Sequence, residues 1–169
     1  PMPDRIPDAL LHNLYNVRAT TWDSGENSHY QGAALVGQAL LARRKGELLD
    51  VLDAGCGTGM VGSLVRTRAR KLVGVDMSQP MLDRALTRCP EAQFSLQDMC
   101  GFSASQPFDL ITCFLYSIHY SASIERLNAC IASVHSALVD GGLFCFNAVD
   151  RQHIDNGSWV SHNVKHADS

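Results

Sequence analysis

Apolar positions along the chain alternate between short continuous runs and helix-like spacings. Short apolar runs predict buried strands, and apolar residues three and four positions apart predict amphipathic helices. Five strands are expected, at residues 48–54, 71–76, 92–97, 108–114 and 143–149. Helices are expected at residues 30–44, at residues 58–69, after Ser78, and from Ile124 to Leu138. Strands that alternate with helices predict an α/β fold with a doubly wound, mainly parallel sheet.

Three of the expected helices have a face predicted to pack on the sheet. The inward residues are expected to be Val61, Leu64 and Val65, then Met81, Leu82, Ala85 and Leu86, and finally Ile124, Leu127, Ile131, Val134 and Leu138. Pro80 fits the first turn of a helix capped by Ser78, because the missing N–H has no helical partner there. Gly141 and Gly142 are expected to end the last helix.

Composition and charge exclude some classes of protein. The 169 residues suit one domain, and 14 Lys and Arg against 17 Asp and Glu give a net charge of −3. This balance argues against a nucleic-acid or membrane binder. The basic runs 43–45 and 66–71 fall at helix carboxyl ends and are interpreted as solvated surface. Six widely spaced cysteines without a CxxC pair favour small buried residues in a reducing compartment, and we expect a cytoplasmic protein.

Residues 51–59 (VLDAGCGTG) join a strand to a helix through a glycine-rich turn. Glycines let the backbone approach a ligand, and the start of the helix supplies N–H donors. Asp76 follows Gly55 by 21 residues and ends the next strand. A carboxylate there can accept hydrogen bonds from both hydroxyls of a ribose. These features predict a site for a nucleotide-like ligand.

Two kinds of nucleotide remain open for this site. Residues 57–62 (GTGMVG) match the dinucleotide pattern GxGxxG, so an NAD-dependent oxidoreductase is one alternative. That register would place Asp53 and Gly55 inside the strand, where both residue types are disfavoured. With Gly55 as the turn glycine, Asp53 lies at the carboxyl end of the strand. A carboxylate there suits an ammonium or sulfonium ligand and would repel a pyrophosphate.

The motifs resemble those of the class I S-adenosylmethionine-dependent methyltransferases. VLDAGCGTG is similar to the first motif of the family, and VGVDMSQPML to its second-strand motif. Residues 97–99, 108–114 and 138–144 are similar to later motifs. Residues 15–23 resemble the family's FDxxAxxYD segment, with Asn16 in place of the first Asp. The resemblance covers about residues 12–150 and implies a Rossmann-like sheet with strand order 3-2-1-4-5.

The resemblance also implies which residues hold S-adenosylmethionine. They are Asp53, Gly55, Cys56 and Gly57 at its amino-acid end, Asp76 at the ribose, Met77, Asp98 and Met99 at the adenine, Phe114 and Leu115 beside the methionine moiety, and Tyr15 or Trp22 above it. Simple packing explains Met77, Tyr15 and Trp22 equally well.

Methyl transfer from a sulfonium is an in-line displacement, so the protein mainly aligns the acceptor and excludes water. A base is needed only for a protonated acceptor. His119 is the candidate base, because neutral imidazole accepts a proton near neutral pH; a structural histidine is the competing interpretation. Tyr116 and Tyr120 are candidates for shaping an acceptor pocket. The pair His162 and His166 lacks the intervening Glu of a zinc motif, and no metal is expected.

The resulting hypothesis is a methyltransferase with a small-molecule acceptor, without nucleic-acid or membrane partners. A non-catalytic cofactor-binding or interaction protein of the same fold is the alternative from another class. The chain is expected to be one domain: residues 1–47 form an N-terminal segment and helix, 48–150 the cofactor-binding core, and 151–169 a polar tail.

The fifth expected strand, residues 143–149, is apolar on both faces. The family usually has two further strands, so this strand would be an unpaired edge. We hypothesise that these residues are a truncated or partly ordered version of a longer methyltransferase, or that the strand mediates self-association.

Overall fold

The computed structural model describes residues 8–24, 31–32, 34, 46–121 and 123–148. Its elements, in chain order, are α1 (Asp8–Arg18), β1 (Leu49–Ala54), α3 (Met60–Val65), the 3-10 turn η2 (Arg66–Arg68), β2 (Ala69–Asp76), α4 (Gln79–Arg88), β3 (Gln93–Leu96), β4 (Phe108–Cys113), the 3-10 turn η3 (Ser117–Ser121), α5 (Ile124–Ala137) and β5 (Leu138–Phe146). The strands form one sheet with the order β3-β2-β1-β4-β5, and all neighbours are parallel. The predicted fold class and strand order are confirmed.

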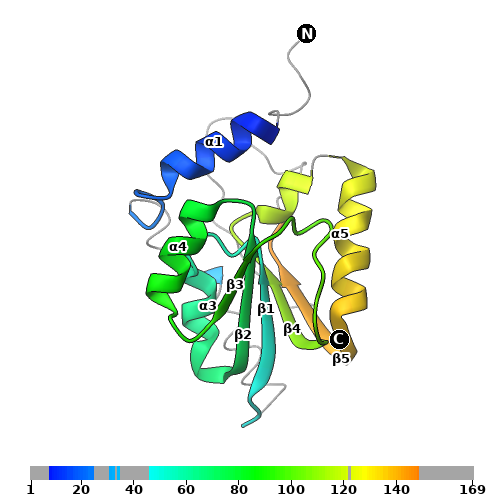
Figure 1. The fold of residues 1–169 in the computed structure, drawn as a ribbon. Coiled ribbons are helices and arrows are strands. Elements are labelled where there is room, and N and C mark those ends of the chain that lie inside the picture. Colours follow the sequence, from blue (N-terminus) through cyan, green and yellow to red (C-terminus); the bar gives the residue numbers. More distant parts are fainter. Residues whose placement is uncertain (1–7, 25–30, 33, 35–45, 122, 149–169) are drawn as a thin grey trace.

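The sheet lies between two helical layers, with α3 and α4 on one face and α5 on the other, while α1 lies across the carboxyl ends of the strands (Figure 1). Successive strand residues point to opposite faces, which gives two cores. Val51 and Leu110 pack with α3, and Leu52 and Ile111 pack with Val134 of α5. Within the described ranges, no helix is both long enough and apolar enough to cross a membrane.

Two of the predicted helix faces, on α3 and α4, need correction. Leu64 and Leu86 were expected inward, but each is 51% exposed. On α3 the contact with the sheet is made by Val61, Gly62 and Val65. A Cβ at Gly62 would lie 3.2 Å from the side chain of Leu72, so the strand packs directly on the helix backbone. The spacing of large apolar residues therefore predicts Leu64 on the buried face of α3, where the structure has Gly62 instead.

The predicted face of α5 is confirmed in part: Val134 is buried, and the partly buried Leu127 and Leu138 pack against the core. The two isoleucines expected on this face do not lie in the core. The buried residues of α5 are Cys130, Val134 and Ala137, whereas Ile124 and Ile131 are 62% and 41% exposed. Small side chains at the contact let the helix approach the sheet closely, which leaves the larger isoleucines at the rim.

Two boundaries differ from the prediction because turns intervene. The helix expected over residues 58–69 ends at Val65, and β2 begins at Ala69 rather than at Lys71. At this turn the Arg66 guanidinium donates to the Ala69 carbonyl at 2.8 Å.

At the other end of the chain, α5 ends at Ala137 and β5 spans Leu138–Phe146 instead of residues 143–149. Gly141, with φ of +74°, lies inside β5, where its register against β4 shifts between Phe108 and Leu110. The glycine pair thus accommodates an irregularity in the strand and does not end the helix.

Helix α1 was not expected from its mixed composition. The helix predicted at residues 30–44 lies almost wholly outside the described residues. The tail 151–169, which contains the pair His162 and His166, lies wholly outside them.

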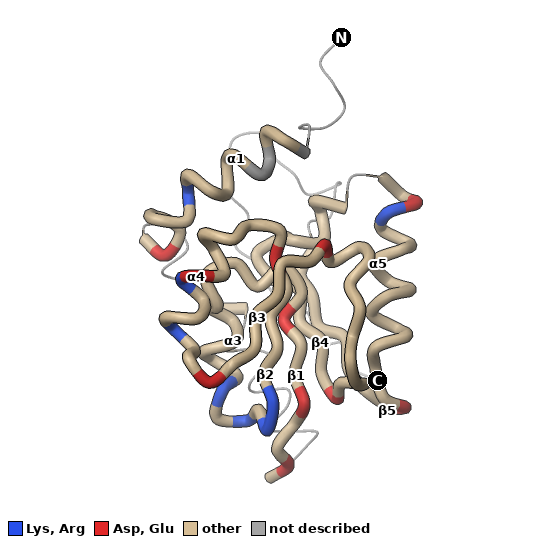
Figure 2. Tube along the Cα trace, viewed as in Figure 1, with Lys and Arg blue, Asp and Glu red and all other residues tan. Residues whose placement is uncertain are grey.

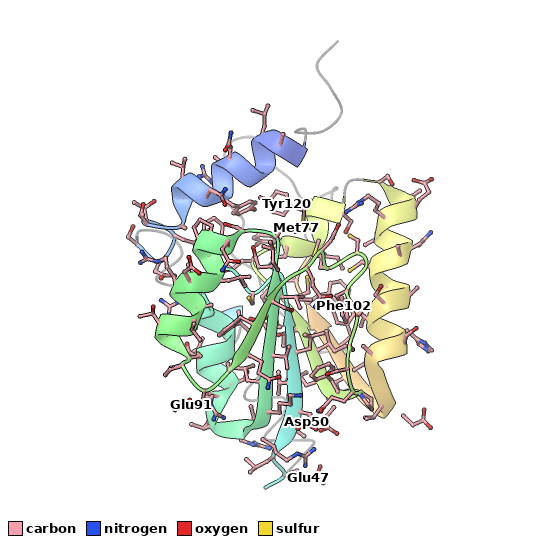
Figure 3. All side chains as sticks on the ribbon, in the orientation of Figure 1. Glu47, Asp50, Met77, Glu91, Phe102 and Tyr120 are labelled. Atoms are coloured by element: carbon pink, nitrogen blue, oxygen red, sulfur yellow. The ribbon has the colours of Figure 1, made fainter. Side chains whose placement is uncertain are left out.

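An ion-pair network joins three strands at their amino ends. The Asp50 N–H donates to Asp109 Oδ2 at 2.8 Å, and Arg70 donates through Nε and Nη2 to the two oxygens of Asp50, both at 2.9 Å. Basic residues gather near this end, around the turn between α3 and β2 (Figure 2). Asp50 therefore lies at the opposite end of the sheet from Met77 and Tyr120 (Figure 3). The carboxyl ends are left for a ligand, as in other open α/β sheets.

Candidate functional site

A cavity lies at the carboxyl ends of the strands, and its lining includes Tyr15 of α1. Its described lining includes Tyr15, Trp22, Gly55, Cys56, Gly57, Thr58, Met60, Asp76, Met77, Ser78, Met81, Gln97, Asp98, Met99, Phe114, Leu115, Ser117, Tyr120 and Arg126. Every residue that the sequence analysis proposed for cofactor binding lines this cavity, except Asp53. The residues come from segments far apart in the chain and meet because the parallel strands all end at this edge.

The turn after β1 requires glycine at Gly55. Its φ is +71°, and its N–H donates to the Val75 carbonyl at 2.8 Å, as does that of Cys56 at 3.0 Å. A Cβ at Gly55 would lie 2.9 Å from the Cβ and Oγ of Ser117, so a side chain would be both strained and crowded. The turn glycine is therefore Gly55, the register that leaves Val51 and Leu52 buried in the strand.

Asp76 ends β2 beside this turn. Its Oδ2 accepts a hydrogen bond from the Gly57 N–H at 2.9 Å, and its Oδ1 accepts one from the Ser78 N–H, also at 2.9 Å. Because a carboxylate oxygen can accept two hydrogen bonds, this carboxylate can hold the loop and still accept from hydroxyl groups of a ligand. The geometry suits a ribose-binding residue.

Asp53 is buried beneath the glycine turn, and it is not among the described residues that line the cavity. Burial raises the pKa of Asp53 to about 6, against the opposing effect of a hydrogen bond from Thr112; the charge of Asp76 raises it further. The Thr112 hydroxyl donates to Asp53 Oδ1 at 2.7 Å. Because Asp53 is separated from the cavity, it can act on a ligand only through the turn or at a distance. A cation above the turn would stabilise its ionised form.

Cys56 also lines the cavity, and its thiol is kept neutral. Burial raises the pKa of Cys56 well above its ordinary value, and the charges of Asp53 and Asp76 raise it further. The expectation that nothing activates this thiol as a nucleophile agrees with these surroundings.

Three aromatic residues form one wall of the cavity, here called the aromatic roof: Tyr15, Trp22 and Tyr120. The Tyr15 ring centroid lies 5.4 Å from that of Trp22 and 5.5 Å from that of Tyr120. Burial raises the pKa of Tyr15 well above its ordinary value, and a hydrogen bond with Tyr120 adds to this. Tyr15 is thus held neutral, and the three rings are well suited to contact an organic ligand.

The segment 15–23, here called the cover segment, is tied to the glycine turn and α4 by contacts that sequence reasoning missed. Asp23 Oδ1 accepts a hydrogen bond from the Thr58 hydroxyl at 2.5 Å, and Asp23 Oδ2 lies 2.6 Å from Arg88 Nη2. Asn16 Oδ1 accepts from the Ser78 hydroxyl at 2.7 Å. Asn16, which departs from the family pattern, therefore still contacts the start of α4.

The cavity lining also contains an ion pair between Asp98 and Arg126. Asp98 Oδ1 accepts a hydrogen bond from the Cys100 N–H at 2.8 Å, and Asp98 Oδ2 pairs with Arg126 Nη2. Met77 and Met99 line the same cavity with polarizable side chains that suit an aromatic base. Arg126 was not predicted; its only sequence signal is a cation in the first turn of a helix, where the helix dipole disfavours it.

The segment after β4 has an unusual backbone. Leu115 and Tyr116 have φ values of 52° and 63°, which is uncommon for residues with side chains and often marks a functional site. The Tyr116 N–H donates to Asn147 Oδ1 at 3.1 Å. His119 follows on η3; it is exposed, its ring centroid lies 6.0 Å from that of Tyr116, and neither residue is among the described cavity lining. The base role of His119 stays a prediction.

Comparisons with known proteins bear on this site. Residues 51–142 match a family model described as a methyltransferase domain. A dTDP-4-amino-2,3,4,6-tetradeoxy-D-glucose N,N-dimethyltransferase from Saccharopolyspora spinosa is 30% identical over 104 residues, 62% of this chain and 42% of that protein. A dTDP-3-amino-3,4,6-trideoxy-alpha-D-glucopyranose N,N-dimethyltransferase from Streptomyces venezuelae is 27% identical over 144 residues, 85% of this chain and 61% of that protein.

A crystal structure of an S-adenosylmethionine-dependent methyltransferase from Clostridium acetobutylicum is 26% identical, with a TM-score of 0.69, over 79% of this chain and 57% of that chain. The chain thus spans about half the length of the relatives it matches. The family match covers more than half of this chain and includes the glycine turn, Asp76 and Asp98. The chain therefore belongs to the S-adenosylmethionine-dependent methyltransferases.

Proposed function

We propose that this chain is the cofactor-binding part of an enzyme that transfers a methyl group from S-adenosylmethionine to a small-molecule acceptor by in-line displacement. The observation that carries the proposal is the cavity in which the Gly55 turn, the Asp76 carboxylate and the Asp98 carboxylate meet. The buried carboxyl group of Asp53 below the turn favours a cationic cofactor. It disfavours NAD, whose pyrophosphate would be brought close to this group.

The order of the strands suggests how the cofactor lies. Its amino-acid end would contact the turn at residues 55–57 and the segment at Phe114 and Leu115, and Asp76 would hold the ribose hydroxyls. The adenine would then extend past Met77 and Met99 towards Asp98. In this arrangement the aromatic roof covers the cofactor, and the chain's own contribution is to orient it and exclude water.

We extend the proposal to an amine acceptor carried on a sugar. Both curated relatives described above act, by their names, on amino groups of nucleotide-linked sugars. The acceptor ammonium group first loses a proton, the neutral amine then attacks the methyl carbon with its lone pair, and the carbon–sulfur bond breaks. His119 is our candidate to take that proton, because a neutral imidazole has one ring nitrogen that can accept it.

Two measurements test the proposal. Isothermal titration calorimetry should show binding of S-adenosylhomocysteine, and a methyl-transfer assay should show turnover with a dTDP-linked amino sugar but not with the matched hydroxyl sugar. Binding without turnover on amine and hydroxyl acceptors would instead support a non-catalytic cofactor-binding protein. Tighter binding of NADH than of S-adenosylhomocysteine would restore the oxidoreductase alternative.

Strand β5 leads us to propose a partner strand. It is the last strand of the sheet in the described part of the chain, and Phe146 is 47% exposed. We propose that its open side pairs with a further strand, from a longer form of this chain or from a second copy. Intact-mass measurement with light scattering tests this: a soluble monomer with a mass near 18.4 kDa would contradict both versions.

We retain the domain division expected from the sequence, with residues 48–150 as the cofactor-binding core. We also propose the cytoplasm as the location of the protein. In support of this, all six cysteines are free thiols, as expected in a reducing compartment.

A further inference from the structure

Arg126 occupies an unusual place for a cation. It lies in the first turn of α5, where its N–H donates to the hydroxyl of the N-cap residue Ser123 at 3.3 Å. The positive end of the helix dipole disfavours a cation at this position. The guanidinium pairs with Asp98, and both side chains line the cavity. The electrostatic cost of this position calls for a compensating interaction, and Asp98 supplies it.

The Asp98 carboxylate is held from two directions. Its Oδ1 is fixed by the backbone N–H of Cys100, and its Oδ2 by the guanidinium of Arg126. The Asp98 side chain is 32% exposed, so without the guanidinium only the Cys100 N–H would hold it, and its Oδ2 could turn towards water. Arg126 thus determines where the outer oxygen of this carboxylate points.

We propose that Arg126 is a positioning residue that sets the purine specificity of the cofactor site through Asp98. Held in place, the carboxylate accepts a hydrogen bond from an exocyclic 6-amino group, as in adenine. It repels a 6-oxo group, as in hypoxanthine, because two acceptors would then face each other. This inference rests on the proposed function, which places the purine at this end of the cavity.

The experiment compares two ligands that differ only at this position of the purine, S-adenosylhomocysteine and S-inosylhomocysteine. Their dissociation constants are measured by calorimetry for the unchanged protein, Arg126→Met, Arg126→Lys, Asp98→Asn and the double variant Asp98→Asn/Arg126→Met. Arg70→Met is the matched control, because it also removes an Arg–Asp ion pair, but at the amino ends of the strands.

Arg126→Met should weaken binding of S-adenosylhomocysteine about tenfold, the effect expected for one charge-assisted hydrogen bond, and leave the inosyl ligand within about twofold. The preference for the adenosyl ligand should therefore fall about fivefold or more. Arg126→Lys should retain most of the preference for the adenosyl ligand. In the Asp98→Asn background, Arg126→Met should not change the preference further, because Arg126 acts through Asp98. Arg70→Met should change neither constant.

Three results would overturn the inference. An unchanged preference in Arg126→Met would make the ion pair merely structural. A higher preference would mean that the guanidinium contacts the base itself, and tighter binding of both ligands would mean that the pair closes the site.

Thermal unfolding checks that each variant is folded. If Arg126→Met is not folded, the preference for the adenosyl ligand is compared between Arg126→Gln, which lacks the positive charge, and Arg126→Lys, which keeps it. Failure of the unchanged protein to bind S-adenosylhomocysteine would contradict the proposed function and not this inference alone.

Discussion

Arg88 and Asp23 form an ion pair that joins the cover segment to the rest of the site. Arg88 Nη2 lies 2.6 Å from Asp23 Oδ2, and Arg88 Nη1 donates to the Thr58 carbonyl at 2.7 Å. One guanidinium therefore links the cover segment, the glycine turn and the end of α4. Burial alone would raise the pKa of Asp23. The pKa is nevertheless held below its ordinary value by hydrogen bonds from Arg88 and Thr58 and by the charge of Arg88. Trp22 of the aromatic roof directly precedes Asp23 in the chain, so this ion pair lies next to the roof.

The first prediction is that Asp23 and Arg88 are energetically coupled. The two side chains are 23% and 29% exposed, so we expect a coupling free energy of about 1–3 kcal/mol. A double-mutant cycle with Asp23→Ala and Arg88→Ala, followed by urea unfolding, measures it. The pair Arg66 and Glu91 is more exposed, at 37% and 68%, and its cycle should give less than about 1 kcal/mol. Equal values for the two pairs would contradict this view of the cover segment.

Asp76→Ala should weaken cofactor binding while leaving the protein folded. The substitution removes a carboxylate that can accept charge-assisted hydrogen bonds from ribose hydroxyls, which corresponds to about 1.5–3 kcal/mol, or roughly 10- to 150-fold in the dissociation constant. Calorimetry with S-adenosylhomocysteine measures the change. Asp83→Ala, on the exposed face of α4, is the control and should bind normally. Normal affinity in a folded Asp76→Ala protein would argue against the whole cofactor assignment.

Gly55→Ala and Gly46→Ala should differ although both glycines have positive φ, +71° and +77°. Among the described residues, a Cβ at Gly46 would meet nothing within 4 Å, so the expected cost is the backbone strain, about 1 kcal/mol. At Gly55 the Cβ would also meet Ser117 at 2.9 Å, so a further 1–3 kcal/mol, roughly, is expected. Urea unfolding of both variants gives the comparison. Equal losses would show that the Gly55 turn tolerates a side chain.

Cofactor affinity should depend on the ionisation of Asp53. The pKa of Asp53, about 6, is raised by burial, so this carboxyl group is mostly protonated at about pH 5 and ionised at about pH 7. Binding of the cationic S-adenosylmethionine should therefore strengthen by up to about tenfold over that interval. Calorimetry at several pH values measures it, and Asp53→Asn should abolish the dependence. A flat profile in the unchanged protein would remove Asp53 from the site.

The same group has the opposite effect on the stability of the cofactor-free protein. Because its folded-state pKa is raised above the unfolded value of 3.8, protonation of Asp53 favours folding. Its contribution is fully present below the unfolded value and is lost as the pH rises through about 6. Urea unfolding at several pH values, compared with Asp53→Asn, isolates this contribution.

His119→Ala should separate catalysis from cofactor binding. If His119 takes the acceptor's proton, the methylation rate at saturating acceptor falls by roughly 100-fold, and the affinity for S-adenosylhomocysteine is unchanged. A rate assay and calorimetry on the same preparation make the comparison. A loss of less than about threefold would assign His119 to packing at the surface of η3.

Much of the fold could be predicted because it depends on local pattern. The buried strands are continuous apolar runs, and the turn at Gly55 and the carboxylate of Asp76 follow from residue type and spacing. The helix faces were harder to predict because Gly62 and Cys130 pack on the sheet. Hydrophobic periodicity gives little weight to small residues, although they allow the closest approach.

The ion pairs of the site could not be predicted at all from the sequence. Arg88 and Asp23 are 65 positions apart, and Arg126 and Asp98 are 28 apart. No local pattern links such residues, since only the meeting of the strand ends brings them together. The cavity lining was found from motifs, whereas the side chains that hold this lining in place were visible only in three dimensions.

The neutral state of Cys56 has a consequence for an enzyme that holds an alkylating agent. In the proposed site, a sulfonium methyl group would be bound in the cavity that Cys56 lines. A thiolate there would compete with the acceptor and become S-methylated, which would inactivate the enzyme one molecule at a time. Burial and the negative charges of Asp53 and Asp76 keep Cys56 protonated. The surroundings that favour a cationic cofactor thus also protect the protein from its own reagent.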